Sequence, residues 1–209
     1  MDAGLKSLIT KAENGDVDAM VMVGDCFTRG INTQADDVQS HKYYKMAADK
    51  GHVKASALVG LDFMDGIGVS ADKKQGIKYM TYAADHGEAF AQFYLGFLYE
   101  NGEIGMSKTL GVGKAIMYYE MAAKQGYAKA QLALAYLYDD NGYALDKQIF
   151  WFVCAYLHGM YQESMEESEK ARQALNQISG RGIFGKQDRI NKTIERVKSD
   201  YPSYLREPK

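Results

Sequence analysis

Apolar residues recur along this chain with the spacing of three and four residues that marks one face of an α-helix. After Gly15, the residues Ala19, Val23 and Phe27 are four positions apart and share one helical stripe. The stripe recurs after three further glycines, as Ala55-Val59-Phe63, Ala91-Leu95-Tyr99 and Ala130-Leu134-Tyr138. The pattern predicts a first helix of about 14 residues in each of four copies of one unit.

A second pattern fills the other half of each unit. Aromatic residues followed by alanines precede each later glycine, as in Tyr43-Tyr44 before Ala47-Ala48 and Tyr118-Tyr119 before Ala122-Ala123. The glycines Gly15, Gly51, Gly87, Gly126 and Gly159 are 36, 36, 39 and 33 residues apart. We take them as phase markers that end the second helix of each unit. The phase predicts helices near 16–29, 36–49, 52–65, 72–85, 88–101, 111–124, 127–140 and 145–158, without a β-sheet.

One helical hairpin cannot bury its own apolar face, whereas stacked hairpins can. The ninth place after three markers is glycine, at Gly24, Gly60 and Gly96. A side chain there would hold neighbouring helices apart, so Gly96→Leu is expected to cost on the order of 1–3 kcal/mol. The sequence therefore predicts an all-α solenoid of antiparallel helix-turn-helix repeats.

The two ends of the chain depart from the repeat. Leu5, Leu8 and Ile9 form a short amphipathic stripe, which predicts a closing helix. After Gly159 the pattern gives way to a charged segment and a last helix at 186–199. We expect one repeat domain over 1–209, with an N-terminal capping helix at 1–14, four repeats at 15–159 and C-terminal capping helices at 160–209.

The unit reads G-x3-A-x3-L-G-x2-Y-x2-G and then W/Y-Y-x2-A-A-x2-G, across roughly residues 12–160. This pattern resembles the Sel1-like repeats, which are relatives of the tetratricopeptide repeat. The resemblance implies a right-handed α–α superhelix and roles as adaptors and scaffolds. Some cysteine-rich, secreted relatives were described as penicillin-binding or penicillin-cleaving. This chain has two cysteines and departs from that pattern.

Composition narrows the functional class. The net charge is −2, so the chain lacks the basic footprint of a nucleic-acid binder. No apolar run reaches about 18 residues, so the sequence predicts no membrane-spanning helix. The first residues do not have the pattern of a signal peptide. Cys26 and Cys154 are too far apart in sequence for a metal motif. We expect the protein to be a monomer in the reducing cytoplasm of a bacterium.

No residue pattern predicts catalysis, a cofactor or a metal. A phosphate-loop interpretation around Gly113-Lys114 fails, because Lys108 and Ala115 occupy positions that the motif gives to Gly and Ser or Thr. The histidines form no ligand pair at i, i+4, and His86 and His158 are interpreted as residues that cap helix ends. Acidic residues near the ends of first helices are interpreted as a solvated face by default, with an acidic stripe that meets a basic partner as the alternative: Asp62, Asp65, Glu100, Asp139 and Asp140.

The third, sixth and tenth places after each marker lie opposite the core stripe by helical angle. In the third copy all three are phenylalanine, and apolar residues flank them in neighbouring copies. We expect one apolar patch on the inner curve, with an acidic border. The predicted protein-binding residues are Phe90, Phe93, Phe97, Leu61, Leu132 and Tyr136, bordered by Asp65, Glu100 and Asp140. Phe90 favours binding, because this place is polar in the other copies; for Phe93 and Phe97, packing between repeats is an equal alternative.

The predicted function is therefore a non-enzymatic interaction module, a scaffold or adaptor that binds a partner protein on the concave face. One alternative is a bacterial immunity protein that neutralises a toxin by occlusion. A second alternative is a hydrolase like the cysteine-rich relatives, which needs a clustered nucleophile and base that the sequence does not display.

Overall fold

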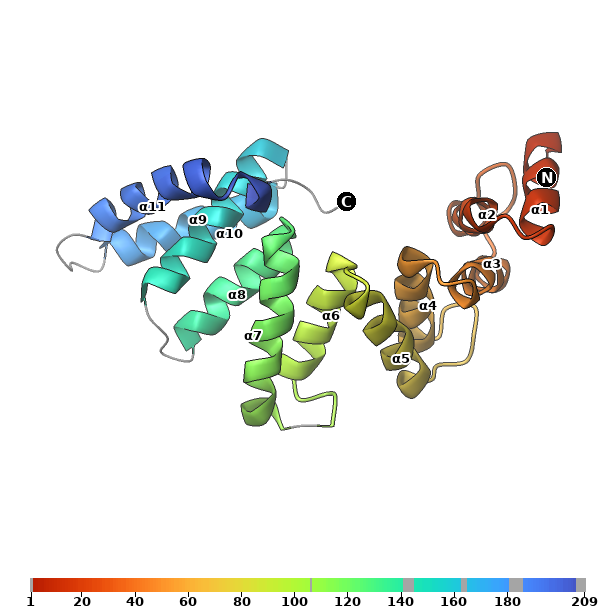
Figure 1. Cartoon of the computed structure of the whole chain (residues 1–209), viewed down its shortest axis with the longest axis horizontal. Helices are drawn as coiled ribbons and strands as arrows, with labels where there is room; N and C mark the ends of the chain where they lie inside the picture. The colour runs from red at the N-terminus through yellow and green to blue at the C-terminus, as the bar shows by residue number, and fades with distance from the viewer. Residues whose placement is uncertain (1, 106, 141–144, 163–164, 181–185, 206–209) are drawn as a thin grey trace. The chain divides into compact units, whose positions relative to one another are not determined.

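The computed structural model describes residues 2–105, 107–140, 145–162, 165–180 and 186–205. Within these ranges the chain forms eleven α-helices, one short 3-10 helix and no strand (Figure 1). The fold is an all-α helical-repeat solenoid, as predicted. In chain order the helices are α1 (Ala3–Glu13), α2 (Val17–Arg29), α3 (Asp37–Asp49), α4 (Val53–Asp65), α5 (Lys73–Asp85), α6 (Ala89–Glu100), α7 (Lys108–Lys124), α8 (Ala128–Asp140), α9 (Leu145–Gln162), α10 (Met165–Gly180), α11 (Lys186–Asp200) and η1 (Pro202–Leu205).

Short polar side chains start several of these helices. Asp16 accepts a hydrogen bond from the Ala19 backbone N–H at 3.0 Å and begins α2. His52 takes the same role for α4, where its Nδ1 accepts from the Ala55 N–H at 3.0 Å. His86 ends α5, and its Nδ1 lies 2.8 Å from the Tyr82 carbonyl oxygen. His86 is thus a capping residue, as predicted.

Two boundaries differ from the prediction. Helix α7 begins at Lys108 rather than near 111, because Ser107 supplies an N-cap that accepts from the Leu110 N–H. Helix α9 continues through Gly159 to Gln162, so this last marker does not end a helix. The prediction for His158 was therefore wrong: the residue lies inside α9 and is buried. The earlier markers do have the left-handed backbone, with φ of 101°, 86°, 90° and 90° at Gly15, Gly51, Gly87 and Gly126.

The chain divides into two compact units, residues 1–91 and 92–209. In the first unit, α1 packs on α2, α2 on α3, α3 on α4 and α4 on α5. In the second, α7 packs on α8 and α8 on α9, while α9 also contacts α10, α11 and η1. The C-terminal helices thus cover α9 on several sides.

A stacked aromatic pair closes each of three hairpins. One ring comes from the end of the first helix and the other from the second helix of the same repeat. The pairs have centroid separations of 6.0, 5.8 and 5.7 Å and interplanar angles of 8°, 12° and 9°: Phe27–Tyr43, Phe63–Tyr79 and Tyr99–Tyr118. The recurrence explains why the sequence repeats an aromatic residue at these two places.

The small residues at the ninth place lie at close helix crossings, as predicted. A Cβ atom on Gly60 would lie 2.8 Å from Met80 Cγ, and one on Gly96 would lie 2.7 Å from Tyr119 Cδ1. Both distances are shorter than a relaxed carbon–carbon contact. A larger residue there must displace a buried side chain.

Alanine at two glycines of the second unit is expected to have opposite effects. Gly96→Ala should lower the free energy of unfolding by about 1–3 kcal/mol, because its methyl group collides with Tyr119. Gly113 lies in α7, where a Cβ atom would meet no other described atom within 4 Å, so Gly113→Ala should raise it by about 0.5–1 kcal/mol through helix propensity. Urea unfolding of both variants checks the pair, and equal effects would contradict the crossing.

Candidate protein-binding surface

The predicted apolar residues of the second unit divide into exposed and packed side chains. Phe97 and Tyr136 are 43% and 42% exposed, whereas Leu132 is only 8% exposed. Phe93 is half-buried, with its ring centroid 5.6 Å from that of Tyr119 and 5.3 Å from that of Tyr127. Phe93 therefore packs between helices, which was one of the two alternatives for this residue.

Burial at the sixth place has a geometric reason. This place points away from the core stripe of its own helix, but a helix inside an array has neighbours on more than one side. Tyr119 of α7 and Tyr127, just before α8, cover Phe93. The angular position of a residue on its own helix does not reveal residues of neighbouring helices that cover it. The sixth place therefore contributes to packing between helices.

The outward side of α6 also includes the seventh place after the marker, which is half-buried. In α6 the seventh place is Tyr94, which sequence reasoning missed. Its ring centroid lies 6.3 Å from that of Phe97 at an angle of 40°. The spacing i, i+3 between two aromatic residues of one helix was the available signal. Tyr94 supports Phe97 from one side while Phe97 remains open to solvent.

The remaining apolar residues of the prediction belong to the first unit. Leu61 and Phe90 are half-buried there, and the predicted border residue Asp65 is exposed. These three residues form a separate set from Phe97 and Tyr136, which belong to the second unit. Their role in binding stays a prediction.

The predicted acidic border contains one structural carboxylate. Glu100 is half-buried and accepts a hydrogen bond from the Tyr119 O–H, with 2.6 Å between the oxygens. Burial, followed by the hydrogen bond to Glu100 and then the Glu100 charge, raises the pKa of the Tyr119 hydroxyl. Glu100 therefore stabilises the α6–α7 hairpin. The side chain of Asp140 lies outside the described part of the structure.

Asp62 is buried rather than solvated, so the interpretation of this residue as part of a solvated face was wrong. The His41 Nδ1 lies 2.8 Å from Asp62 Oδ2, and the two residues are 7% and 8% exposed. The pair joins α3 to α4, the second helix of one repeat to the first helix of the next. Desolvation raises the pKa of Asp62, and the hydrogen bond from His41 opposes this shift.

A signal for this pair exists in the aligned repeats. The places equivalent to Asp62 hold Cys26, Leu98 and Leu137, and those equivalent to His41 hold Ile77, Ile116 and Ile149. Only one repeat junction has two ionisable groups where the others have apolar ones. Comparing columns between copies, rather than counting acids near helix ends, would have identified it.

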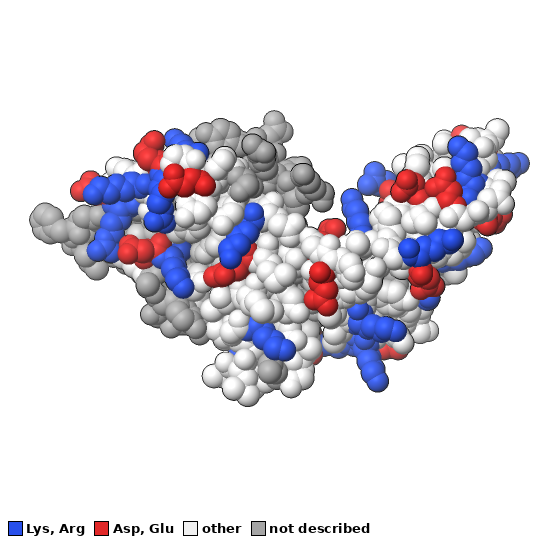
Figure 2. All heavy atoms as spheres, viewed as in Figure 1, with Lys and Arg blue, Asp and Glu red and all other residues white. Residues whose placement is uncertain are grey.

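Two other kinds of site are absent from the described residues. These residues contain no group of three or more His, Cys, Asp or Glu side chains placed to hold a metal ion. No helix in the same ranges combines the length and apolar character needed to cross a membrane. On the face shown in Figure 2, cationic and anionic side chains of the described residues are interspersed.

Comparison with known proteins supplies the family. The Sel1 repeat model matches residues 17–52, 53–88, 89–127 and 128–141. A crystal structure of a Sel1 repeat protein from Oxalobacter formigenes is similar with a TM-score of 0.66 and 28% identity, over 82% of this chain and 74% of that one. The Pseudomonas aeruginosa protein 5086 shares the fold at a TM-score of 0.53 and 18% identity, over 98% and 76% of the two chains.

A third structure is too distant for an argument. The immunity protein Pa5087 of Pseudomonas aeruginosa is 18% identical over 91% of this chain and 83% of that one, with a TM-score of 0.40. A search of curated proteins finds no significant match. The family model covers more than half of the chain, and the helices repeat in the order that the family pattern requires. The chain belongs to the Sel1 repeat family.

Proposed function

We propose that the chain is a non-enzymatic interaction module that binds a partner protein through exposed aromatic side chains on its first helices. The family generally mediates protein–protein interactions. The observation that carries the proposal is the exposure of Phe97 and Tyr136, 43% and 42%. Both occupy the tenth place of their repeats, in α6 and α8.

Large exposed aromatic residues support binding for a physical reason. Leaving a phenyl ring in water costs free energy that a partner can recover on contact. Aromatic anchors at the centre of an interface often carry much of its affinity. Phe97 is partly ordered by Tyr94, and Tyr136 packs edge-on against Phe152 at 5.1 Å. Ordered rings lose little conformational entropy on binding.

The test measures partner capture and stability on the same variants. Phe97→Ala is expected to weaken partner binding by about 1–3 kcal/mol, which is roughly 5-fold to 150-fold in Kd. Its melting temperature should stay near that of the wild type, because the side chain is largely exposed. Met117→Ala is the matched control, since Met117 is 47% exposed but lies on a second helix, α7.

Quantitative mass spectrometry of proteins retained by immobilised wild type and variants provides the measurement. A partner retained equally by wild type and Phe97→Ala would contradict the proposal, as would equal losses with Met117→Ala. The identity of the retained partner separates an adaptor from an immunity protein, because only the latter retains a toxin. Hydrolysis by the purified chain would favour the enzyme alternative.

A further inference from the structure

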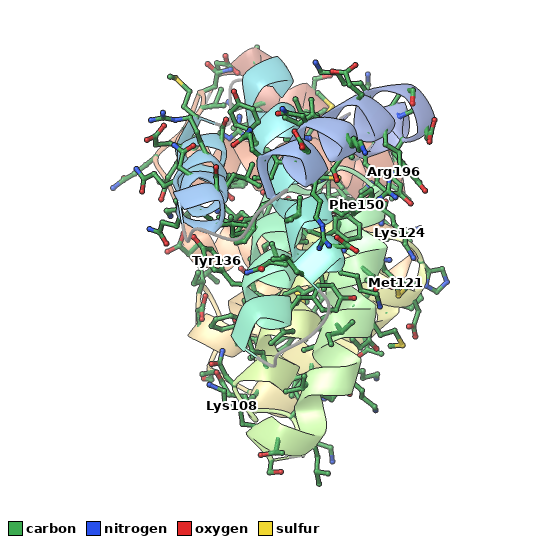
Figure 3. All side chains as sticks on the ribbon, turned by 90° about the vertical axis from the view of Figure 1, so that its left-hand side faces the viewer. Lys108, Met121, Lys124, Tyr136, Phe150 and Arg196 are labelled. Carbon is green, nitrogen blue, oxygen red and sulfur yellow. The ribbon has the colours of Figure 1, made fainter. Side chains whose placement is uncertain are left out.

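The second unit contains a cavity of about 300 Å³ that lies apart from Tyr136 and is bounded by α7, α8, α9, α11 and η1. Figure 3 shows Met121, Lys124, Phe150 and Arg196 along one side of the unit, with Tyr136 on the opposite side. The cavity is therefore distinct from the exposed aromatic surface around Tyr136. Aromatic and cationic side chains line the cavity together.

Four aromatic residues build the apolar wall. The Trp151 ring stacks on Tyr204, with 5.8 Å between centroids and an angle of 16°. Phe150 meets Trp151 edge-on at 4.9 Å and Tyr201 edge-on at 5.3 Å. These contacts fix the orientation of each ring. An apolar side chain entering the cavity would meet ring surfaces that are already ordered.

A buried hydrogen bond holds the short helix η1 against this wall. Gln131 of α8 is fully buried, and its Nε2 donates to the Tyr204 carbonyl oxygen at 2.6 Å. The same amide nitrogen donates to the Ala123 carbonyl oxygen at 3.1 Å. The segment that carries Tyr201 and Tyr204 is thus hydrogen-bonded to the repeat array as well as packed against it.

The cations at the cavity exceed the available carboxylates. Glu120 accepts a hydrogen bond from the Tyr138 O–H at 2.8 Å and pairs with Lys124 at 3.5 Å. The other carboxylate, Asp146, lies 3.5 Å from the Arg189 guanidinium. Both carboxylates of the lining therefore already have cationic or hydroxyl partners.

Lys147 and Arg196 are the remaining cations. Lys147 Nζ lies over the Tyr138 ring at 5.3 Å, and the Arg196 guanidinium lies over the Phe150 ring at 5.2 Å. Within the described ranges, no carboxylate lies within 4 Å of either cation. A cation on a ring face is held in position but keeps its charge available to an anion. The cavity therefore offers positive charge directly beside an apolar wall.

The first unit provides a contrast. Its cavity of about 690 Å³ includes the equivalent aromatic pair, Phe27 and Tyr43. Lys42 stands at the place of Phe150, and the carboxylate of Glu13 also lines the space. The Asp36 carboxylate lines this space as well, and the lysine in place of a phenyl ring makes the apolar wall smaller. The wall of four rings beside the two cations Lys147 and Arg196 is a feature of the second-unit cavity.

We propose that the second-unit cavity is a further binding site that takes an acidic segment of a partner protein, with an aromatic side chain packed against the wall of Phe150, Trp151, Tyr201 and Tyr204 and flanking carboxylates on Lys147 and Arg196. Charge complementarity identifies the occupant, because no described carboxylate of the chain pairs with these two cations. Two charge-assisted contacts beside an aromatic anchor give both orientation and affinity. This site is additional to the surface around Phe97 and Tyr136.

Trp151 is the single tryptophan of the chain, so its fluorescence reports on this cavity without a label. The probe is the acetylated and amidated tripeptide Glu-Phe-Glu. We expect a saturable change in Trp151 fluorescence. The peptides Gln-Phe-Gln and Glu-Ala-Glu should bind at least tenfold more weakly, because one lacks the charges and the other lacks the ring. Raising the salt concentration should weaken binding of Glu-Phe-Glu.

Variants test the two cations. Arg196→Gln and Lys147→Gln should each weaken Glu-Phe-Glu binding about tenfold, while far-UV circular dichroism and melting temperature confirm folding. Lys198→Gln is the matched control on α11, because Lys198 pairs with Glu195 at 3.7 Å and does not line the cavity. It should leave binding unchanged. Phe97→Ala should also leave it unchanged, which separates this test from that of the proposed function.

The proposal is overturned by a non-saturating or absent fluorescence response, or by equal binding of Gln-Phe-Gln. It is also overturned if folded Arg196→Gln and Lys147→Gln proteins bind Glu-Phe-Glu like the wild type. Acetyl-phenylalanine, with a free carboxylate, tests the other occupant. Binding as tight as that of Glu-Phe-Glu would replace the internal acidic segment with a partner's C-terminus.

Discussion

Replacing His41 with isoleucine is expected to lower the free energy of unfolding by about 3–5 kcal/mol, because it leaves Asp62 buried without its partner. Isoleucine is the residue that the equivalent places of the other repeats carry, at Ile77, Ile116 and Ile149. The loss therefore does not arise from an unsuitable side-chain shape. Urea unfolding of His41→Ile measures it.

The matched double variant separates charge from packing. His41→Ile with Asp62→Leu gives this junction the apolar pairing found elsewhere in the chain. Its stability should equal that of the wild type or exceed it by about 1–4 kcal/mol, because the desolvation cost of both ionisable groups disappears. A double variant as unstable as His41→Ile would show that the pair supports packing beyond its mutual hydrogen bond.

The pH dependence of His41→Ile provides a second signature. Desolvation raises the pKa of Asp62 above its ordinary 3.8, the charges of Asp37 and Asp65 add to the rise, and His41 opposes it. Without His41 the pKa should rise further. Because the folded-state pKa of Asp62 lies above its unfolded-state pKa, protonation of Asp62 stabilises the native state. This stabilisation is fully present below the unfolded-state pKa and is lost as the pH rises through the folded-state pKa. The deficit relative to the double variant should therefore shrink between about pH 7 and about pH 4.

Replacing Tyr119 with alanine is expected to lower the free energy of unfolding by about 3–5 kcal/mol, as for other large aromatic residues in a core. Tyr119 is 1% exposed, fills the space above Gly96 and donates a hydrogen bond to Glu100. The truncation removes all three interactions and leaves a cavity between α6 and α7. Thermal and urea unfolding give the magnitude.

The same cavity makes a coupled prediction for Gly96→Leu. In the wild-type background this change collides with the Tyr119 ring. In Tyr119→Ala the new leucine has space to occupy, so the double variant should be more stable than the sum of the two losses predicts. Ile190→Ala on α11 is the control, and its effect should add to that of Gly96→Leu. Additive losses for Gly96→Leu and Tyr119→Ala would show that the two residues do not meet.

Most of the fold could be predicted because each helix repeats its signals. The stripe of Ala19, Val23 and Phe27 and the glycine at Gly30 recur often enough to fix both phase and boundaries. The prediction was wrong where a local side chain overrides the period. Ser107 starts α7 earlier, and Gly159 lies inside α9, although a glycine in isolation favours a helix end.

The candidate surfaces were less accessible to sequence reasoning. Helical angle identified Phe97 and Tyr136 as outward residues, but it also placed Phe93 outward, where Tyr119 and Tyr127 cover it. The cavity beside Trp151 depends on η1 lying against α7, α9 and α11, and no repeat pattern describes that segment. Long-range contacts of a non-repeating terminus cannot be derived from a period.

The buried pair of His41 and Asp62 also gives the repeats an order. Stacks such as Phe27–Tyr43 lie within single hairpins, so a hairpin could be transposed without disturbing its own closure. The polar pair instead spans two repeats. If the second and third repeats exchanged places, His41 would face Leu98 and Asp62 would meet an isoleucine. An exchange of these repeats would therefore leave two buried polar groups without their partner and lower the stability of the fold. The buried pair thus specifies which repeat follows the first.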